Sequence, residues 1–321
     1  MERALIKEAK EFAGLWGGFR ASRVVLTANN LRVFESIGKG RSSEDLAKAL
    51  RTDPRAMEIL LDAVASLGLL RKSGTIYRLA SLAKRFLLPD SPWYQGDMLR
   101  HADALWMNWS GLDNVVRTGL PNRAGARDHD VFIRAMHNNA VLRARDVIGA
   151  LDLRGIKKAL DLGGGPGTYG IELAKRGIDV THFDLPDTLE VAREMARKNS
   201  VKNVTFRSGD FHFDDIGSGY DLVLISQVLH SNSVVENIAL LGKTHDALAP
   251  RGWIAIHEFA LNEDRASPVP GALFSVNMLV NTSGGRSYTR KEMKGWLTKA
   301  GFRKIAVKDL GETVLVMGRK R

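Results

Sequence analysis

Strand and helix patterns alternate regularly over the C-terminal half of this 321-residue chain. Short apolar runs typical of buried strands are separated by amphipathic runs typical of helices. Regular alternation of this kind predicts a parallel, doubly wound α/β sheet. The last segment predicts a hairpin that turns near Gly311, and its final strand must run antiparallel to its neighbour. The expected strands cover 157–162, 178–186, 204–210, 220–230 and 252–261, and the expected helices cover 167–177, 188–199, 234–250 and 288–302.

The N-terminal part has a different pattern, in which helices precede a short hairpin. An N-cap serine, Ser42 or Ser43, and the N-cap residue Asp53 begin two of the helices. The hairpin is expected to turn at Ser73 and Gly74. This order is typical of a winged-helix domain that is all-helical apart from its hairpin. The expected helices cover 5–16, 21–37, 42–50 and 54–67, and the hairpin covers 70–80.

The length of the chain suits two domains, since single cores rarely grow beyond roughly 250 residues. We expect a winged-helix domain over 1–95 and an α/β domain over 151–321. A helical connector rich in aromatic residues joins them over 96–150.

The composition excludes some kinds of function and leaves others open. A net charge of +11 raises nucleic acid as a partner, but the exposed side of the helix over 54–67 offers Glu58 and Asp62 beside Arg55. Acidic residues would face phosphate, so we expect this domain to contact a partner subunit instead. The chain has no cysteine, which excludes disulfides and thiolate nucleophiles. Without an apolar run of about 18 residues or a signal peptide, we expect no membrane contact and a cytoplasmic location.

A glycine-rich stretch, DLGGGPGTYG at 161–170, follows the first expected strand. Read from Gly165 it is G-x-G-x-x-G, a dinucleotide fingerprint, with Asp184 further on as the ribose acid. Read from Gly163 it is an acid followed by G-x-G-x-G, the loop of S-adenosylmethionine-dependent methyltransferases. The first register predicts hydride transfer, and the second predicts methyl transfer.

The residues after the next two strands favour methyl transfer. In open α/β sheets, ligands bind beyond the carboxyl ends of the strands. Asp184 follows the second strand and suits ribose hydroxyls, whereas Asp210 follows the third and suits an adenine amine, with Phe211 beside the ring. A pyrophosphate favours helix N-terminal amides and cations, but a sulfonium tolerates carboxylates such as these and Asp161. The acids therefore favour S-adenosylmethionine over a nicotinamide cofactor.

Together these motifs resemble the small-molecule O-methyltransferase family, which includes plant caffeic acid and flavonoid enzymes and bacterial polyketide-tailoring enzymes. The resemblance extends over nearly the whole chain, through SLGLL, GTIYRLA, WSGLDNVVRTG, DLGGGPG, FDLP, GDF, VLH and LAPRGWIAIHE. It implies a Rossmann-like class I methyltransferase sheet with a C-terminal antiparallel hairpin. It also implies a homodimer through the N-terminal winged-helix domain, S-adenosylmethionine as methyl donor and a small-molecule acceptor.

The resemblance identifies a set of positions that contact the methyl donor. The family's lysine after the fourth strand is replaced here by Ser226, which changes one of these contacts. The other expected donor-site residues are Asp161, Gly163, Gly165, Gly167, Asp184, Leu185, Asp210 and Phe211.

His230 is the expected general base. A neutral phenol is a poor nucleophile, so a positioned base speeds the transfer, typically by about 10² to 10⁴. Of the eight histidines, His230 ends the fourth strand at the edge where donor and acceptor meet, and it matches the family's base. Glu258, at the end of the fifth strand, matches the acid that orients the base, while His257 should point to the opposite face.

Three positions near the base depart from the family pattern. Ser231 and Asn232 follow His230 where the family has Asp and Trp, and Ser287 stands where it has a second supporting acid. The orienting set is therefore expected to be half complete. Methylation at carbon or nitrogen, and a non-methylating reaction on the same fold, remain alternatives to methylation at oxygen.

The expected acceptor pocket is apolar and aromatic with a few amide groups, which suits a flat, mostly apolar acceptor. No His, Asp or Glu set has metal-ligand spacing, so no metal is expected. From other classes, a DNA-binding regulator that senses S-adenosylmethionine and a nicotinamide oxidoreductase remain alternatives. The pocket residues are Trp106, Trp109, Met136, Asn139, Phe274, Asn277 and Met278, the last three in a helical insertion over 271–282.

Overall fold

The computed structural model describes residues 2–124 and 128–321, and it divides into two compact units. One unit runs to Asp103, and the other begins at Ala104. The division falls within the expected connector over 96–150, of which residues 125–127 lie outside the described part. In the part of the chain that is described, no helix combines the length and the apolar character needed to cross a membrane.

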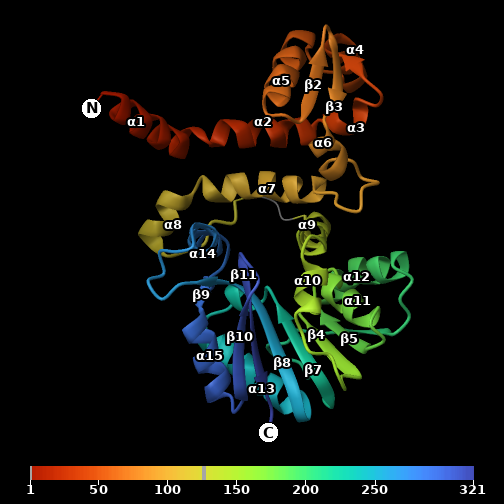
Figure 1. The fold of residues 1–321 in the computed structure, drawn as a ribbon, viewed down its shortest axis with the longest axis vertical. Coiled ribbons are helices and arrows are strands. Elements are labelled where there is room, and N and C mark those ends of the chain that lie inside the picture. Colours follow the sequence, from red (N-terminus) through yellow and green to blue (C-terminus); the bar gives the residue numbers. More distant parts are fainter. Residues whose placement is uncertain (1, 125–127) are drawn as a thin grey trace. The chain divides into compact units, whose positions relative to one another are not determined.

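The N-terminal unit consists of helices and a small antiparallel sheet, shown in red to orange in Figure 1. The predicted order of helices followed by a hairpin is confirmed, and a short first strand, not predicted, joins the hairpin. The helices are α1 (Glu2–Gly17), α2 (Phe19–Asn30), α3 (Val33–Ser36), α4 (Ser43–Leu50), α5 (Pro54–Ser66) and α6 (Ser81–Phe86). The strands are β1 (Arg41–Ser42), β2 (Leu70–Ser73) and β3 (Ile76–Leu79), in the order β1-β3-β2.

Local sequence signals explain most of the element ends in this unit. The N-caps at Ser42 and Asp53 are confirmed, since each side chain accepts a hydrogen bond from the backbone N–H three residues on. The helix expected over 21–37 is interrupted at Arg32, whose φ of +57° places it in the left-handed region. The hairpin turn begins at Gly74, one residue later than predicted.

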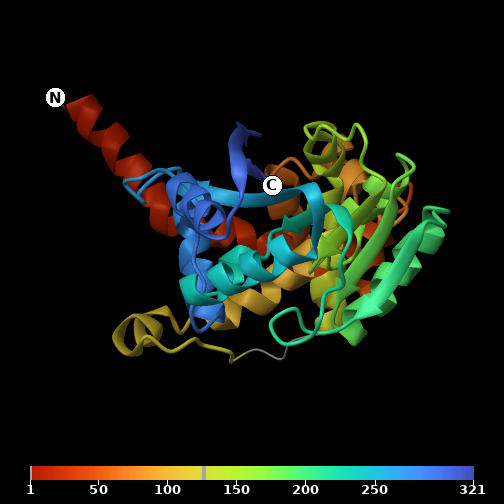
Figure 2. The same cartoon turned by 90° about the horizontal axis from the view of Figure 1, so that it is seen from below.

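Helix α1 extends away from the rest of its unit in both views (Figures 1 and 2). Leu5, Phe12 and Trp16 lie on one side of the helix and are 66%, 67% and 55% exposed. Phe19, at the start of α2, continues the row and is 52% exposed. Leu5, Phe12 and Trp16, extended by Phe19 of α2, are called the apolar face of α1 below. A row of this length differs from the single exposed apolar residues that are common on protein surfaces.

In the described part of the chain, four helices lie between α6 and the large sheet: α7 (Gly96–Trp109), α8 (Leu112–Thr118), α9 (His129–Val141) and α10 (Ala144–Gly149). Helix α7 begins in the first unit and ends in the second. Helices α9 and α10 are separate, because α9 ends at Val141 and α10 begins at Ala144. Helix α9 contacts two further helices of the second unit, α11 (Thr168–Ala174) and α12 (Pro186–Lys198).

The large sheet has the strand order β6-β5-β4-β7-β8-β11-β10. The pairs from β6 to β8 are parallel, whereas β11 is antiparallel to both of its neighbours, as predicted for the closing hairpin. A short strand, β9 (Tyr288–Thr289), pairs with the end of β8. The strands are β4 (Lys158–Leu162), β5 (Asp179–Asp184), β6 (Val204–Ser208), β7 (Tyr220–Ser226), β8 (Leu248–Leu261), β10 (Arg303–Asp309) and β11 (Thr313–Arg319).

Helices cover both faces of this sheet, and alternate residues of each strand face opposite sides. On β7, Val223 and Ile225 belong to the core with α13 (Val234–Ala247) and α15 (Arg290–Lys299). Leu222 and Leu224 belong to the core on the other face, with α10 and α11. The carboxyl ends of the parallel strands meet at one edge, near which Figure 1 shows α9 and α14 (Val269–Asn281).

Candidate active site

The glycine-rich loop joins β4 to α11 at the carboxyl edge of the sheet. Gly163, Gly165 and Gly167 have φ of +64°, +56° and +76°, a region that residues with a Cβ rarely adopt. The Gly165 N–H donates to Asp184 Oδ2 over 2.8 Å. A Cβ added at Gly165 would meet no atom of the described residues within 4 Å. The loop therefore has open space beside this backbone, which fits the close approach of a bound small molecule.

Two carboxylates lie at the ends of the neighbouring strands β5 and β6. Asp184 Oδ1 accepts a hydrogen bond from the N–H of Leu185, a residue that is 47% exposed. Asp210 Oδ1 accepts one from the His212 N–H over 2.9 Å. Asp210 Oδ2 has no hydrogen-bond partner among the described residues. Both carboxylates therefore keep acceptor capacity for hydroxyl or amine groups of a ligand.

The loop after β6 is held in place by Lys243 of α13. Its Nζ donates to the carbonyl of Phe211 over 2.9 Å and to that of Asp214 over 2.8 Å. Phe211 Cε1 lies 3.3 Å from where a Cβ on Gly163 would be, so this ring stands beside the glycine-rich loop. Lys243 was missed from the sequence, because a lysine on an amphipathic helix is ordinary.

Two predicted donor residues have side chains committed to the protein interior. Asp161 is fully buried, and its Oδ2 accepts the Gly170 N–H of α11 over 3.0 Å. The Ser226 hydroxyl is hydrogen-bonded to His257 Nδ1 over 2.9 Å. Alternation along the strands explains both, because these positions lie on the face covered by α10 and α11. The part of Asp161 and Ser226 in the donor site stays a prediction, and in this structure their side chains bond groups beneath the edge.

His230 and Glu258 form a buried pair at the carboxyl edge of the sheet, where His230 follows β7 and Glu258 lies near the end of β8. His230 lies in a short 3₁₀ helix, Leu229–Ser231, and the two residues are 9% and 2% exposed. His230 Nδ1 lies 2.8 Å from Glu258 Oε2, and its backbone N–H donates to Oε1 over 3.4 Å. A proton on Nδ1 that bonds the carboxylate leaves the lone pair on Nε2. No hydrogen bond to Nε2 is found among the described residues.

Two of the residues that depart from the family pattern, Asn232 and Ser287, have side chains that are hydrogen-bonded away from this pair. Asn232 Nδ2 donates to Asn237 Oδ1 over 3.2 Å, and the Ser287 hydroxyl donates to the Gly271 carbonyl over 2.9 Å. Neither side chain is hydrogen-bonded to the His230 ring. In the described part of the chain, one carboxylate therefore orients this ring.

Gly285 lies directly against the backbone of His230. A Cβ at this glycine would lie 2.3 Å from the His230 carbonyl oxygen and 3.0 Å from the carbonyl carbon of Ser231, a residue that is itself exposed. Real Cβ atoms do not approach so closely. The segment that precedes β9 therefore fixes the backbone position of the histidine.

Helix α14 brings an aromatic ring and an amide to the same region. The Phe274 ring meets the His230 ring edge-to-face at 4.8 Å, and Asn277 lies one turn further along the helix. Asn277 Oδ1 accepts hydrogen bonds from Trp109 Nε1 over 2.9 Å and from Asn281 Nδ2 over 3.1 Å. These two donors fix the orientation of the Asn277 amide, so its Nδ2 is directed away from them. No partner of this Nδ2 is found within the described chain.

The remaining predicted pocket residues lie on three helices. Met278 is buried on α14, and Trp106 is half-buried on α7. Met136 and Asn139 are half-buried on α9, which contacts α11 and α12. Their common pocket stays a prediction.

Gln227 was not predicted, although two of its features are unusual. Its φ is +59°, and its Nε2 is buried without a hydrogen-bond partner among the described residues. A left-handed non-glycine residue and an unpaired buried amide each cost free energy, and such features gather at functional sites. A glutamine after a strand carries no sequence signal, so only the structure reveals it.

His257 is neutral and fully buried on the face opposite Glu258, as the alternation along β8 predicted. Burial, and to a smaller degree the nearby charge of Arg143, lowers the pKa of His257 to about 3. Its Nε2 is hydrogen-bonded to the hydroxyl of Thr313 over 3.0 Å. The ring therefore connects β7, β8 and β11 without carrying a charge.

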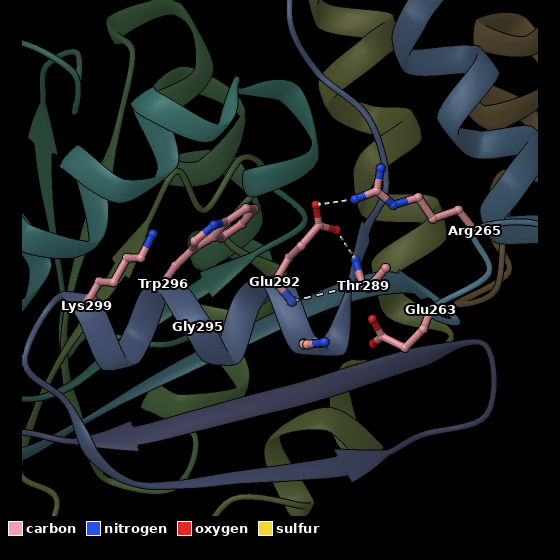
Figure 3. Close-up of a pocket in the computed structure, with 8 residues that line it drawn as sticks. Glu263, Arg265, Thr289, Glu292, Gly295, Trp296 and Lys299 are labelled. Carbon is pink, nitrogen blue, oxygen red and sulfur yellow. Dashed lines mark hydrogen bonds and ion pairs between the residues drawn. The ribbon is translucent and has the colours of Figure 1, made fainter.

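A separate surface hollow of about 380 Å³ lies beside α15 (Figure 3). Its lining includes Glu263, Arg265, Lys291, Glu292 and Lys299, and Arg265 is paired with Glu292 over 3.0 Å. None of the predicted site residues lines it. The hollow is therefore distinct from the edge that holds His230.

Comparison with known proteins identified two matching family models and many similar proteins. The O-methyltransferase domain matches residues 119–303, and the O-methyltransferase dimerisation domain matches residues 13–89. An acetylserotonin O-methyltransferase of Gallus gallus is 32% identical, over 94% of this chain and 95% of that protein. The tetracenomycin polyketide synthesis 8-O-methyl transferase TcmO of Streptomyces glaucescens is 32% identical over 94% of both chains. The structure of human N-acetylserotonin methyltransferase in complex with S-adenosylmethionine has a TM-score of 0.89 and 27% identity, over 98% of this chain and 97% of that chain.

Proposed function

The chain belongs to the O-methyltransferase family and uses S-adenosylmethionine, and on this premise we propose which residues act and which class of molecule accepts the methyl group. The acceptor is a hydroxyl of an aromatic or polycyclic small molecule, His230 is the general base, and Glu258 orients it. The observation that carries this proposal is the 2.8 Å contact from His230 Nδ1 to Glu258, which leaves Nε2 as a proton acceptor. The family match leaves the regulator and oxidoreductase alternatives without support.

The methyl donor would bind along the glycine-rich loop and the ends of β5 and β6. When bound, it supplies a methyl group on a sulfonium, which the acceptor oxygen takes by displacement. Asp184 would accept hydrogen bonds from the ribose hydroxyls, and Asp210 Oδ2 would accept one from the adenine amine. Phe211 would lie against the adenine ring. The open backbone at Gly165 and the unused acceptor capacity of both carboxylates support this assignment.

The base works through one tautomer of His230. Its Nδ1–H donates to Glu258, so the lone pair of Nε2 takes the proton of the acceptor hydroxyl as the oxygen attacks. The proton remains on Nε2, and the imidazolium that forms is stabilised by the carboxylate 2.8 Å from Nδ1. The buried position of both groups strengthens this interaction relative to water.

The acceptor would lie against Phe274 and be oriented by amides. Phe274 contacts the ring of the base, so an aromatic acceptor stacked beside it would bring its hydroxyl near Nε2. The amide Nδ2 of Asn277 would donate to an oxygen of the acceptor, because its Oδ1 is already occupied. Relatives named for acetylserotonin, for a hydroxynaphthoate and for a polyketide support an aromatic acceptor. Within the connector over 96–150, Trp106, Trp109, Met136 and Asn139 would complete the pocket, with Met278.

Site variants test the assignment of the base. Transfer of a radiolabelled methyl group to N-acetylserotonin and to hydroxynaphthoates, followed by NMR of the product, identifies an acceptor and shows whether oxygen is methylated. With the acceptor identified in this way, His230→Ala should lower kcat by about 10² to 10⁴, while the Kd for S-adenosylhomocysteine stays unchanged. Glu263 is an exposed glutamate on the same stretch of chain, so Glu263→Gln is the matched control for Glu258→Gln. Full activity of His230→Ala would refute the base and leave the donor site standing.

We also propose that the chain forms a homodimer through its N-terminal domain, residues 1–95. The matching dimerisation domain and the apolar face of α1 support this, since exposed rows of apolar residues mark protein interfaces. Light scattering after size exclusion should give twice the mass of 35.4 kDa. Phe12→Asp should shift the species toward a monomer, whereas a monomeric wild-type chain at micromolar concentration would overturn the proposal.

A further inference from the structure

We propose that His182 is a positioning residue for the glycine-rich loop, and that it sets the affinity for the methyl donor by holding the carbonyl of Gly165. The inference rests on the donor site proposed above. It adds a residue that neither the glycine pattern nor the strand-end acids indicate. His182 lies within β5, and its side chain is 1% exposed.

His182 forms a buried pair with Asp161 of the neighbouring strand. The two residues are directly opposite in the parallel register of β4 and β5. His182 Nδ1 lies 3.3 Å from Asp161 Oδ2, and Nε2 lies 3.2 Å from the Gly165 carbonyl oxygen. The ring also contacts Phe206 of β6 at 5.7 Å between centroids. The histidine is thus fixed from both neighbouring strands, and its outer nitrogen reaches the loop.

The loop is built closely over this pair. A Cβ at Gly164 would lie 2.4 Å from Asp161 Oδ2 and 2.5 Å from His182 Cε1. One at Gly167 would lie 3.6 Å from the same ring carbon. The imidazole and the carboxylate therefore form the floor of the loop, and there is no room for a side chain between them.

The hydrogen bonds define what each ring nitrogen does. A carbonyl oxygen only accepts, so the contact with Gly165 requires a proton on Nε2. Nδ1 contacts Asp161 Oδ2 over 3.3 Å, and the same oxygen accepts the Gly170 N–H, so this carboxylate ties the ring to the start of α11. The peptide groups of Gly165 are then held on both sides, with the N–H on Asp184 and the carbonyl on His182. Loss of the second contact would let the loop turn away from the geometry in which Asp184 faces the donor.

Substitution of His182 by Gln or Asn distinguishes the roles of its two ring nitrogens. The amide N–H of Gln can lie near the position of Nε2, and that of Asn can lie near the position of Nδ1. Calorimetry with S-adenosylhomocysteine should give His182→Gln a Kd within about threefold of wild type. His182→Asn and His182→Leu should bind about tenfold more weakly, equivalent to about 1.4 kcal/mol. A merely structural role would lower Tm in all three variants and leave the Kd unchanged, which overturns the proposal. If the wild-type chain itself does not bind, the donor site fails and the inference fails with it.

A measurement on the wild-type protein covers the case in which the variants do not fold. In ¹⁵N-histidine-labelled protein, the His182 signal is assigned by its absence from His182→Gln or, if that variant is unfolded, by its contact with the Phe206 ring. Nε2 should carry a proton that exchanges slowly with water. An unprotonated Nε2 would overturn the proposal, because it could not donate a hydrogen bond to the Gly165 carbonyl oxygen.

Discussion

Acid should destabilise this fold through His257, and the effect can be worked out from its burial. Burial and the charge of Arg143 lower its pKa to about 3 in the folded chain, whereas the ordinary value is 6.5. Between these two values the unfolded chain binds a proton that the folded chain does not. The contribution of His257 to stability is therefore fully present above pH 6.5, and it is lost as the pH falls toward 3.

The magnitude follows from the two pKa values. At pH 5 the unfolded histidine is almost fully protonated and the folded one is neutral, which costs about 2 kcal/mol of unfolding free energy. The figure depends little on the folded pKa, provided that the ring stays neutral at pH 5. His257→Gln removes the titrating group and keeps an amide that can bond Ser226 or Thr313.

Urea unfolding at pH 7.5 and pH 5, followed by tryptophan fluorescence, measures the difference. Wild type should lose about 2 kcal/mol more than His257→Gln between the two pH values. Thr313→Val is the control, because it removes the hydrogen-bond partner of Nε2 and keeps the histidine. It should be less stable by about 1 kcal/mol at both pH values, with the pH dependence of wild type. Equal losses in wild type and His257→Gln would refute a neutral buried His257.

Three further predictions concern the site. Gly285→Ala should lower kcat by about 10², because the new Cβ displaces the backbone of His230 and a misplaced catalytic group slows a reaction by about this factor. Gly295→Ala is the control. It should keep wild-type kinetics, because a Cβ there meets no atom of the described residues. Asp184→Asn should weaken S-adenosylhomocysteine binding in calorimetry by about tenfold. The amide nitrogen of Asn is a donor, so it would face the backbone N–H of Gly165 or Leu185 without a hydrogen bond. Lys243→Met, which releases two carbonyls of the loop after β6, should raise the KM for the methyl donor severalfold at unchanged kcat, and an unchanged KM would contradict it.

Features set by local chemistry were predictable from the sequence. Asp53 caps a helix because its side chain accepts a hydrogen bond from the backbone N–H of Ala56, three residues further on. This contact needs no distant part of the chain. His230 and Glu258 could be placed at one edge because His230 follows one parallel strand and Glu258 lies near the end of the next. The interruption at Arg32 was missed, since neither glycine nor proline marks it.

Contacts between distant parts of the chain were not predictable from a single sequence. Trp109 meets Asn277 across 168 positions, and the polar network that fixes the amide depends on how α7 and α14 pack. The commitment of Asp161 and Ser226 to the interior depends on which face of the sheet the last residues of each strand occupy. Strand ends predict proximity to a site, but they do not decide whether a side chain points into it.

The two-sided attachment of Gly165 has a consequence for the thermodynamics of binding. Fixing the backbone of one residue costs roughly 1 to 2 kcal/mol of conformational entropy. Here the loop is already fixed by Asp184 and by His182, so a ligand that binds against it needs to order little further backbone. The heat-capacity change on binding should then report mainly the surface of the ligand and its immediate walls, with little contribution from coupled folding.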